Sequence, residues 1–143
     1  KTWSDPKASA LVHPDAPPMV FHLSDGKTLI TFFHNRHINT QYVGLTGKMD
    51  GMKDRAEIWV SLSKDGGRNW SNPRFLFTNA TRPNPAKNGW FNHNSSYMDA
   101  VIDNGTIHIF LPHLWNRAVY MQLKEKDLGK LPTVKQLAKR LPK

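Results

Sequence analysis

The chain contains no cysteine, which excludes a disulfide framework and any metal site built on thiolates. No apolar run approaches the ~20 residues that a helix needs to cross a bilayer, so no membrane span is expected. Acidic residues are scarce beside basic ones, 11 against 20, and the formal net charge is +9. The one dense basic stretch, 124–143, is typical of a solvated tail, and it predicts no nucleic-acid partner. A basic cleft that attracts an anionic ligand is the remaining interpretation of the charge.

Turn-forming and aromatic residues are abundant instead, with ten prolines, nine glycines and five tryptophans in 143 residues. This composition, with few helical periods, favours an all-β chain with many turns. The length is that of one domain, and we treat residues 1–143 as a single region.

One stretch organises the rest of the chain. Its spacing is S-x-D-x-G-x-x-W, formed by Ser63, Asp65, Gly67 and Trp70. It lies between two apolar runs, 58–62 and 75–77, and consecutive glycines between such runs predict a hairpin. The short side chains of Ser63 and Asp65 can bond the backbone of the turn, and Trp70 can pack over it.

Parts of this stretch recur. The residues Trp3-Ser4-Asp5-Pro6 match Trp70-Ser71-Asn72-Pro73, 67 residues later. We therefore expect the chain to begin inside such a box and to be the C-terminal part of a larger protein, with any signal peptide upstream.

A second echo has an offset of 62, because Arg-Ala, Lys-Asp and Gly at 55–67 return at 117–129. Glu125 and Pro132 replace the serine and the tryptophan, so this copy is a decayed box. Repeats of this length, built from short strands and hairpins, indicate β-propeller blades.

The same pattern predicts the individual strands. A truncated blade ends at Leu11-Val12, and a short closing helix is predicted over 133–140. The strands of one whole blade and of the next are expected at 18–23, 28–34, 57–62 and 74–77, and then at 96–102, 106–111 and 119–123.

Turns alternate between two faces of such a blade. The tight turns at Asp25, Asp65 and Asn104 fall on one face, and longer loops fall on the other. Long loops in a compact domain are usually functional, so we place the candidate site there. The candidate residues of this face that we name as substrate-binding are His34, Arg36, His37, His93, Asn94, His113 and Arg117.

The box resembles the Asp-box, or bacterial neuraminidase repeat, of the sialidase superfamily. The resemblance implies a partial β-propeller of the sialidase type, with a little over two four-stranded antiparallel blades. It also implies that Ser63, Asp65, Gly67 and Trp70 are structural.

The resemblance further implies catalytic roles for two residues. Sialidases bind the substrate carboxylate with three arginines, and Arg55 stands at the place of the third, ten residues before Asp65. Tyr97 is placed like the sialidase nucleophile. A tyrosine suits an anionic substrate, which would repel a carboxylate nucleophile. The chain departs from the family at 110–113, where sialidases commonly carry a glutamate that braces an arginine.

Three functions stay open at this point. The first is a sialidase-like glycoside hydrolase acting on acidic glycans, which needs no cofactor and no metal, and which is secreted or periplasmic. The second is a propeller polysaccharide lyase or uronic-acid glycosidase, with Tyr97 or a histidine as acid or base. The third is a non-catalytic propeller that binds glycan or protein. An isolated piece is expected to lack turnover, and its open edges favour association with other copies.

Overall fold

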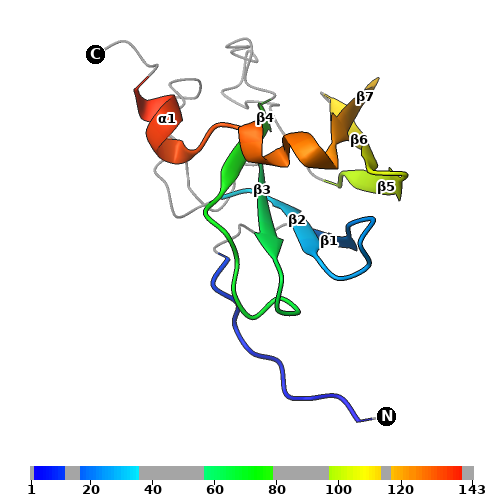
Figure 1. Cartoon of the computed structure of the whole chain (residues 1–143), viewed down its shortest axis with the longest axis vertical. Helices are drawn as coiled ribbons and strands as arrows, with labels where there is room; N and C mark the ends of the chain where they lie inside the picture. Colours follow the sequence, from blue (N-terminus) through cyan, green and yellow to red (C-terminus); the bar gives the residue numbers. More distant parts are fainter. Residues whose placement is uncertain (1, 12–16, 36–56, 79–96, 114–116, 140–143) are drawn as a thin grey trace, which may run out of the picture.

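The computed structural model describes residues 2–11, 17–35, 57–78, 97–113 and 117–139, which form two antiparallel sheets (Figure 1). The first sheet has the order β1-β2-β3-β4 and the second the order β5-β6-β7. The elements are β1 (Met19–His22), β2 (Leu29–Phe33), β3 (Glu57–Ser63), β4 (Arg74–Thr78), β5 (Asp99–Asp103), β6 (Thr106–His113), β7 (Arg117–Lys124), the 3-10 helix η2 (Glu125–Lys130) and the helix α1 (Val134–Ala138).

Every strand predicted for the two blades is present, within three residues of its expected bounds. In each sheet, every strand pairs with the strand that precedes it in the chain. Short turns join β1 to β2 and β5 to β6 and allow only antiparallel neighbours there, whereas β2 and β3 pair across the longer connection 34–56. The fold is mostly β and consists of two open sheets, consistent with a partial propeller.

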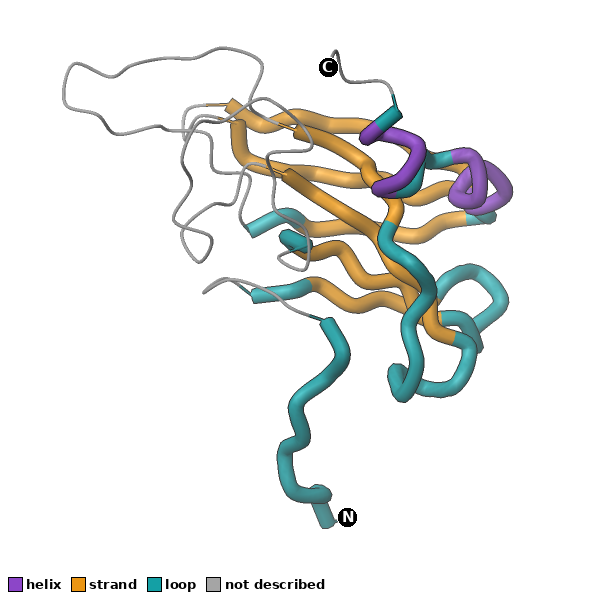
Figure 2. The backbone as a smooth tube through the Cα atoms, turned by 90° about the vertical axis from the view of Figure 1, so that its left-hand side faces the viewer, coloured by secondary structure: helices purple, strands orange, loops and turns teal. Residues whose placement is uncertain are grey.

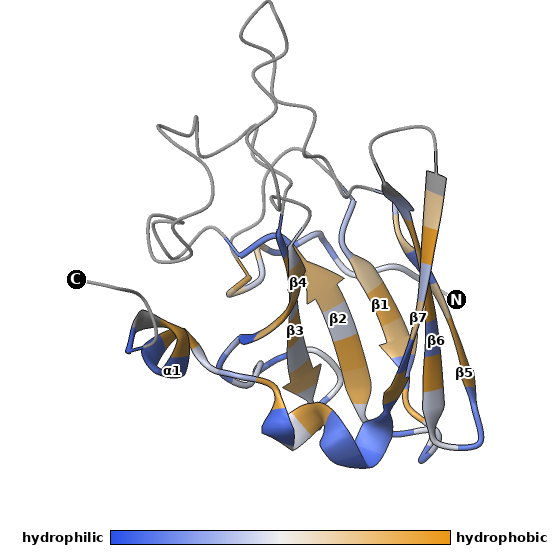
Figure 3. Cartoon of the chain, turned by 90° about the horizontal axis from the view of Figure 1, so that it is seen from above, coloured by the Kyte–Doolittle hydropathy of each residue, from blue (hydrophilic) through white to orange (hydrophobic). Residues whose placement is uncertain are grey.

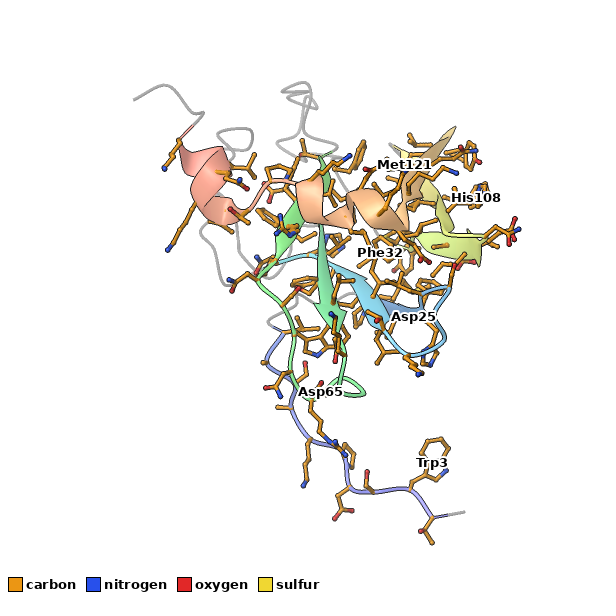
Figure 4. All side chains as sticks on the ribbon, viewed as in Figure 1. Trp3, Asp25, Phe32, Asp65, His108 and Met121 are labelled. Carbon is orange, nitrogen blue, oxygen red and sulfur yellow. The ribbon has the colours of Figure 1, made fainter. Side chains whose placement is uncertain are left out.

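The hydrophobic core lies between the two sheets. Ile30, Phe32 and Val60 of the first sheet belong to the same buried cluster as Ile107 and Ile109 of the second. Figure 4 shows Phe32 and Met121 lying between the two sheets, and Figure 3 shows apolar residues along the strands of both sheets. Burying one such side chain stabilises the fold by about 1.5–3 kcal/mol. The strands β1 and β5 lie next to each other at this junction.

The tight turns gather at one end of the two sheets, which we call the turn end (Figure 3). Three hydrogen bonds join the turn at Asp25, the turn at Asn104 and the start of η2, and the pairing of β3 with β2 and β4 brings the turn at Asp65 to the same end. The N–H of Gly105 donates to Ser24 Oγ at 2.9 Å, the N–H of Ser24 donates to Glu125 Oε1 at 2.8 Å, and the N–H of Glu125 donates to Gly105 O at 2.9 Å. The predicted placement of these turns on one face is therefore confirmed.

The decayed box does not form a hairpin. Residues Glu125–Lys130 form η2, in which Asp127 pairs with Lys130 at 2.5 Å. The chain then crosses back to the outer edge of the first sheet. There Phe75 N donates to Pro132 O at 2.9 Å, and an Arg74 guanidinium nitrogen donates to Leu131 O at 2.6 Å.

The predicted closing helix is confirmed as α1, within the 133–140 segment (Figure 2). A capping box begins it. The N–H of Gln136 donates to Thr133 Oγ1 at 3.4 Å, and Thr133 N donates to Gln136 Oε1 at 2.8 Å. Two N–H groups that the first turn leaves unpaired are thereby satisfied. In the described part of the chain, no helix has the length and apolar character that crossing a membrane requires.

The expectation of an outer strand ending at Leu11-Val12 is not confirmed, because residues 2–11 belong to no strand and Val12 lies outside the described residues. This segment extends away from both sheets (Figures 1 and 4), and Trp3 is 99% exposed. A strand needs a neighbour to satisfy its backbone, and neither described sheet lies beside this segment.

Candidate functional site

The candidate site lies at the end of the sheets opposite the turn end, where β2 and β6 finish and β3, β5 and β7 begin. His34 follows the last residue of β2, and Tyr97 precedes β5 by two residues. His113 ends β6 and Arg117 begins β7. The other predicted residues, Arg36, His37, Arg55, His93 and Asn94, lie outside the described residues.

Tyr97 has an unusual backbone. Its φ is 65°, in the left-handed region that a bulky L-residue rarely adopts. This conformation costs roughly 1–2 kcal/mol. The ring is 59% exposed, whereas the next residue, Met98, is only 4% exposed and belongs to the core. The buried Met98 side chain anchors the start of this strand, while the phenol of Tyr97 faces solvent. Backbone strain of this kind is characteristic of functional positions.

A buried polar cluster lies at the same end, formed by His34, Asn35 and Glu57, each no more than 3% exposed. His34 Nδ1 lies 2.7 Å from the carbonyl oxygen of Glu57. Since a carbonyl only accepts, Nδ1 carries the proton in this bond. The carboxylate of Glu57 accepts from Trp59 Nε1 at 3.1 Å. The imidazole of His34 is therefore held inside the protein, and its burial suits a positioning role better than direct contact with a substrate.

Sequence reasoning placed His34 and Asn35 in the loops of the candidate site but missed Glu57. A glutamate at the start of a strand has no pattern that separates a buried carboxylate from a solvated one.

The Asp-box forms the turn between β3 and β4 at the turn end (Figure 4). Ser63 Oγ donates to Asp65 Oδ1 at 2.8 Å and accepts from Gly67 N at 2.9 Å. Asn69 donates to the same carboxylate twice, from its backbone N–H at 2.9 Å and from its side-chain amide at 2.6 Å. The indole of Trp70 packs over Gly67, since a Cβ on Gly67 would lie 3.6 Å from the ring.

These bonds lower the pKa of Asp65 to about 2, through the backbone N–H of Asn69, the Asn69 side chain and the Ser63 hydroxyl, in that order. The pKa of Asp25, in the turn between β1 and β2, is lowered in the same way. Its pKa falls to about 2 because the Thr28 hydroxyl and the N–H groups of Lys27 and Thr28 bond its carboxylate. Both carboxylates are occupied by their own turns, which supports a structural role for the box residues.

An exposed aromatic and polar cluster lies on the outer face of the second sheet. Tyr120 stacks on His108, with ring centroids 6.1 Å apart and planes 11° from parallel, and it also contacts Phe110 at 5.0 Å. The Tyr120 hydroxyl accepts from Gln122 Nε2 at 2.5 Å and lies 2.7 Å from His108 Nδ1. These residues were not named from the sequence, and they lie on the sheet face rather than at the candidate site.

The arrangement offers two kinds of chemistry. An exposed phenol at Tyr97 can act as a nucleophile or as an acid or base, provided that a neighbouring group takes its proton. The bond between His34 and the backbone of Glu57 ties the end of β2 to the start of β3. Among the described residues, no three histidine, aspartate or glutamate side chains come together as metal ligands.

The sequence also matches the model of a known family. The model of the BNR repeat-like domain matches residues 1–109, which include both turns with a bonded aspartate, Tyr97 and β5. No curated protein and no solved structure matches the chain. The match covers well over half of the 143 residues and agrees with the two sheets and the Asp-box geometry. The chain therefore belongs to the BNR repeat-like family, within the sialidase/BNR superfamily.

Proposed function

We propose that this chain is part of a sialidase-like glycoside hydrolase that acts on acidic glycans such as sialic acid. In this proposal Arg55 binds the carboxylate of the substrate and Tyr97 is the nucleophile. The observation that carries the proposal is the exposed, strained Tyr97 at the end of the sheets opposite the Asp-box. The net charge of +9 suits an anionic sugar, and the site of action would be the cell exterior or the periplasm.

The proposed chemistry begins with attack of the Tyr97 hydroxyl oxygen on the anomeric carbon. A neighbouring carboxylate accepts the phenolic proton, and the bond from the anomeric carbon to the leaving oxygen breaks. An acid protonates that oxygen, and water later displaces Tyr97 from the sugar. The cluster of His34, Asn35 and Glu57 would hold the β2 and β3 ends steady beneath this site. The carboxylate and the acid are assigned to the longer protein.

The test measures release of free sialic acid from a reporter by the longer protein that contains this chain. Tyr97→Phe removes only the hydroxyl, and we expect it to abolish release while the fold persists. Tyr120→Phe is the matched control, since it removes a hydroxyl from another half-exposed tyrosine away from the site. Unchanged activity in Tyr97→Phe would refute the assignment of the nucleophile.

A second candidate is a lyase acting on uronic acids. Position 113, at the end of β6, is a histidine where sialidases commonly carry a bracing glutamate. A histidine there suits acid or base chemistry better than it suits bracing an arginine. A lyase would produce new ultraviolet absorbance from an unsaturated uronate, with no sialic acid released. Glycan binding with neither activity would instead identify a non-catalytic propeller.

A further inference from the structure

The turn between β5 and β6 consists of an asparagine followed by a glycine. Asp103 pairs with Thr106, so only Asn104 and Gly105 connect the two strands. Their φ values are 45° and 72°, both positive, as the type I′ turn of a two-residue hairpin requires. Asn104 is exposed to solvent. The turn thus presents an exposed asparagine-glycine pair at the turn end, where the two sheets meet.

An asparagine-glycine pair can react within its own backbone. The backbone nitrogen of Gly105 attacks Cγ of Asn104, and a new bond joins these two atoms. The bond from Cγ to the side-chain nitrogen breaks, and that nitrogen takes up the displaced proton through water and leaves as ammonia. Water then opens the resulting succinimide ring and leaves aspartate or isoaspartate. Glycine favours the reaction, because it has no Cβ to obstruct the approach of its nitrogen.

The fold engages the nitrogen that has to attack. The N–H of Gly105 donates to Ser24 Oγ at 2.9 Å, and the carbonyl oxygen of Gly105 accepts from Glu125 N at 2.9 Å. Both partners lie outside the hairpin, since Ser24 belongs to the turn between β1 and β2 and Glu125 begins η2. A backbone that is bonded on both sides cannot rotate toward the side chain of Asn104. The reaction therefore requires a local opening of the turn end.

We propose that Asn104 is a deamidation site and that the Ser24 hydroxyl controls its rate. While the bond from Gly105 to Ser24 is intact, the side-chain amide of Asn104 persists. When the bond breaks, the nitrogen of Gly105 is free to attack. The modification does not depend on the enzymatic function, because Tyr97 lies at the other end of the sheets.

The product changes the contact between the two sheets. Isoaspartate adds one carbon to the backbone, so the turn between Asp103 and Thr106 can no longer have the two-residue geometry. The N–H of Gly105 then moves away from Ser24 Oγ. Aspartate keeps the length of the backbone but places a second negative charge beside Asp103. Formation of isoaspartate at position 104 therefore removes one of the three hydrogen bonds of the turn end permanently.

The first test compares the rate of deamidation in the folded and the unfolded chain. The 143-residue chain is incubated in buffer and in concentrated urea at one pH and temperature, and peptide mass spectrometry follows each asparagine. Asn88-Gly89, the other such pair in the sequence, lies outside the described residues and serves as the reference in urea. We expect the two pairs to react at similar rates in urea, and Asn104 to react at least roughly tenfold more slowly in buffer. Equal rates for Asn104 in buffer and in urea would overturn the proposed protection.

The second test changes the acceptor. Ser24→Ala should raise the rate at Asn104 in buffer about two- to tenfold, the factor by which one hydrogen bond shifts a local opening equilibrium, and should leave the rate in urea unchanged. Ser24→Thr keeps an accepting hydroxyl and should react like the original chain. Ser4→Ala is the matched control, because Ser4 lies in the exposed segment 2–11.

A further variant covers the case in which Ser24→Ala does not fold. Glu125→Ala removes the oxygen that accepts from the N–H of Ser24, so Ser24 is held less firmly and the rate at Asn104 should also rise. Circular dichroism and urea unfolding verify that each variant is folded under the conditions of the incubation. A folded Ser24→Ala chain, or a folded Glu125→Ala chain in its place, that deamidates at the original rate would refute control by Ser24.

Discussion

The backbone N–H of Ser24 donates a 2.8 Å hydrogen bond to Oε1 of Glu125, a residue 101 positions further along the chain. Ser24 belongs to the turn between β1 and β2, and Glu125 begins η2 at the end of β7. The bond therefore joins the two sheets at the turn end, outside the hydrophobic core. In the decayed box Glu125 occupies the position of Ser63, so a residue lost to the box serves the contact between repeats.

Replacing Glu125 with alanine should weaken this junction. A typical hydrogen bond contributes about 0.5–1.5 kcal/mol to the free energy of unfolding, and an exposed one lies at the lower end. Glu125→Gln keeps an accepting oxygen, so it should lose less. Lys126→Ala, at the neighbouring exposed position, is the control and should unfold at the same urea concentration as the original chain. Equal losses for the alanine and glutamine variants would show that the oxygen does not matter.

Asp25 and Asp65 should make the free energy of unfolding depend on pH in the acid range. Their folded pKa is about 2, below the ordinary value of 3.8. As the pH falls below 3.8 the unfolded chain takes up protons first, while the folded chain resists until about pH 2. The unfolded state then binds more protons, and stability falls across this window.

Urea unfolding at several pH values measures this effect. Asp25→Asn and Asp65→Asn should each unfold more easily at neutral pH and show a flatter decline between pH 3.8 and 2. A variant with the original slope would show that its aspartate does not cause the acid sensitivity.

Gly67 should tolerate asparagine better than alanine. Its φ is 86°, and a Cβ there would meet the Trp70 ring at an ordinary 3.6 Å. The cost of Gly67→Ala therefore comes from the backbone conformation and should be roughly 1–2 kcal/mol. Gly67→Asn should cost less, because asparagine enters the left-handed region more readily. Thermal or urea unfolding orders the three proteins, and a lower stability for asparagine than for alanine would point to steric contact instead.

Shortening one side chain of the shared core should lower the stability of the protein. Ile107 of β6 is fully buried between the sheets. Ile107→Ala should lower the free energy of unfolding by about 2–5 kcal/mol, through lost burial and a residual cavity. Val101→Ala, at a position 58% exposed in the neighbouring strand β5, should change it by at most about 0.5 kcal/mol. Similar losses at both positions would contradict the location of the core.

Much of this fold could be predicted from the sequence, because alternating apolar residues and glycine turns carry local signals. The Asp-box was predictable for the same reason: the bonds of Ser63 and Asp65 run within seven residues, from 63 to 69. The second copy of the box does not form a hairpin, because the glutamate at 125 and the proline at 132 cannot make the contacts of Ser63 and Trp70. The chain there forms a 3-10 helix instead.

Other features carried no such signal. The hydrogen bond from Phe75 N to Pro132 O joins two backbone groups, and no pattern of side chains in the sequence predicts it. The buried carboxylate of Glu57 depends on which groups the fold brings around it, and strand alternation alone would allow it to face water. The left-handed backbone conformation of Tyr97 could not be predicted either, because glycine or asparagine is the residue expected at such a φ.

The crossing of residues 131–133 to the edge of β4 binds the end of the second repeat to the first. Neither sheet can unfold without breaking these hydrogen bonds or the core between the sheets. The two sheets should therefore unfold in one cooperative transition rather than in two. Trimming the chain before Leu131 would also expose the start of β4, where Arg74 and Phe75 bond residues 131 and 132, and a protease would then gain access to this strand.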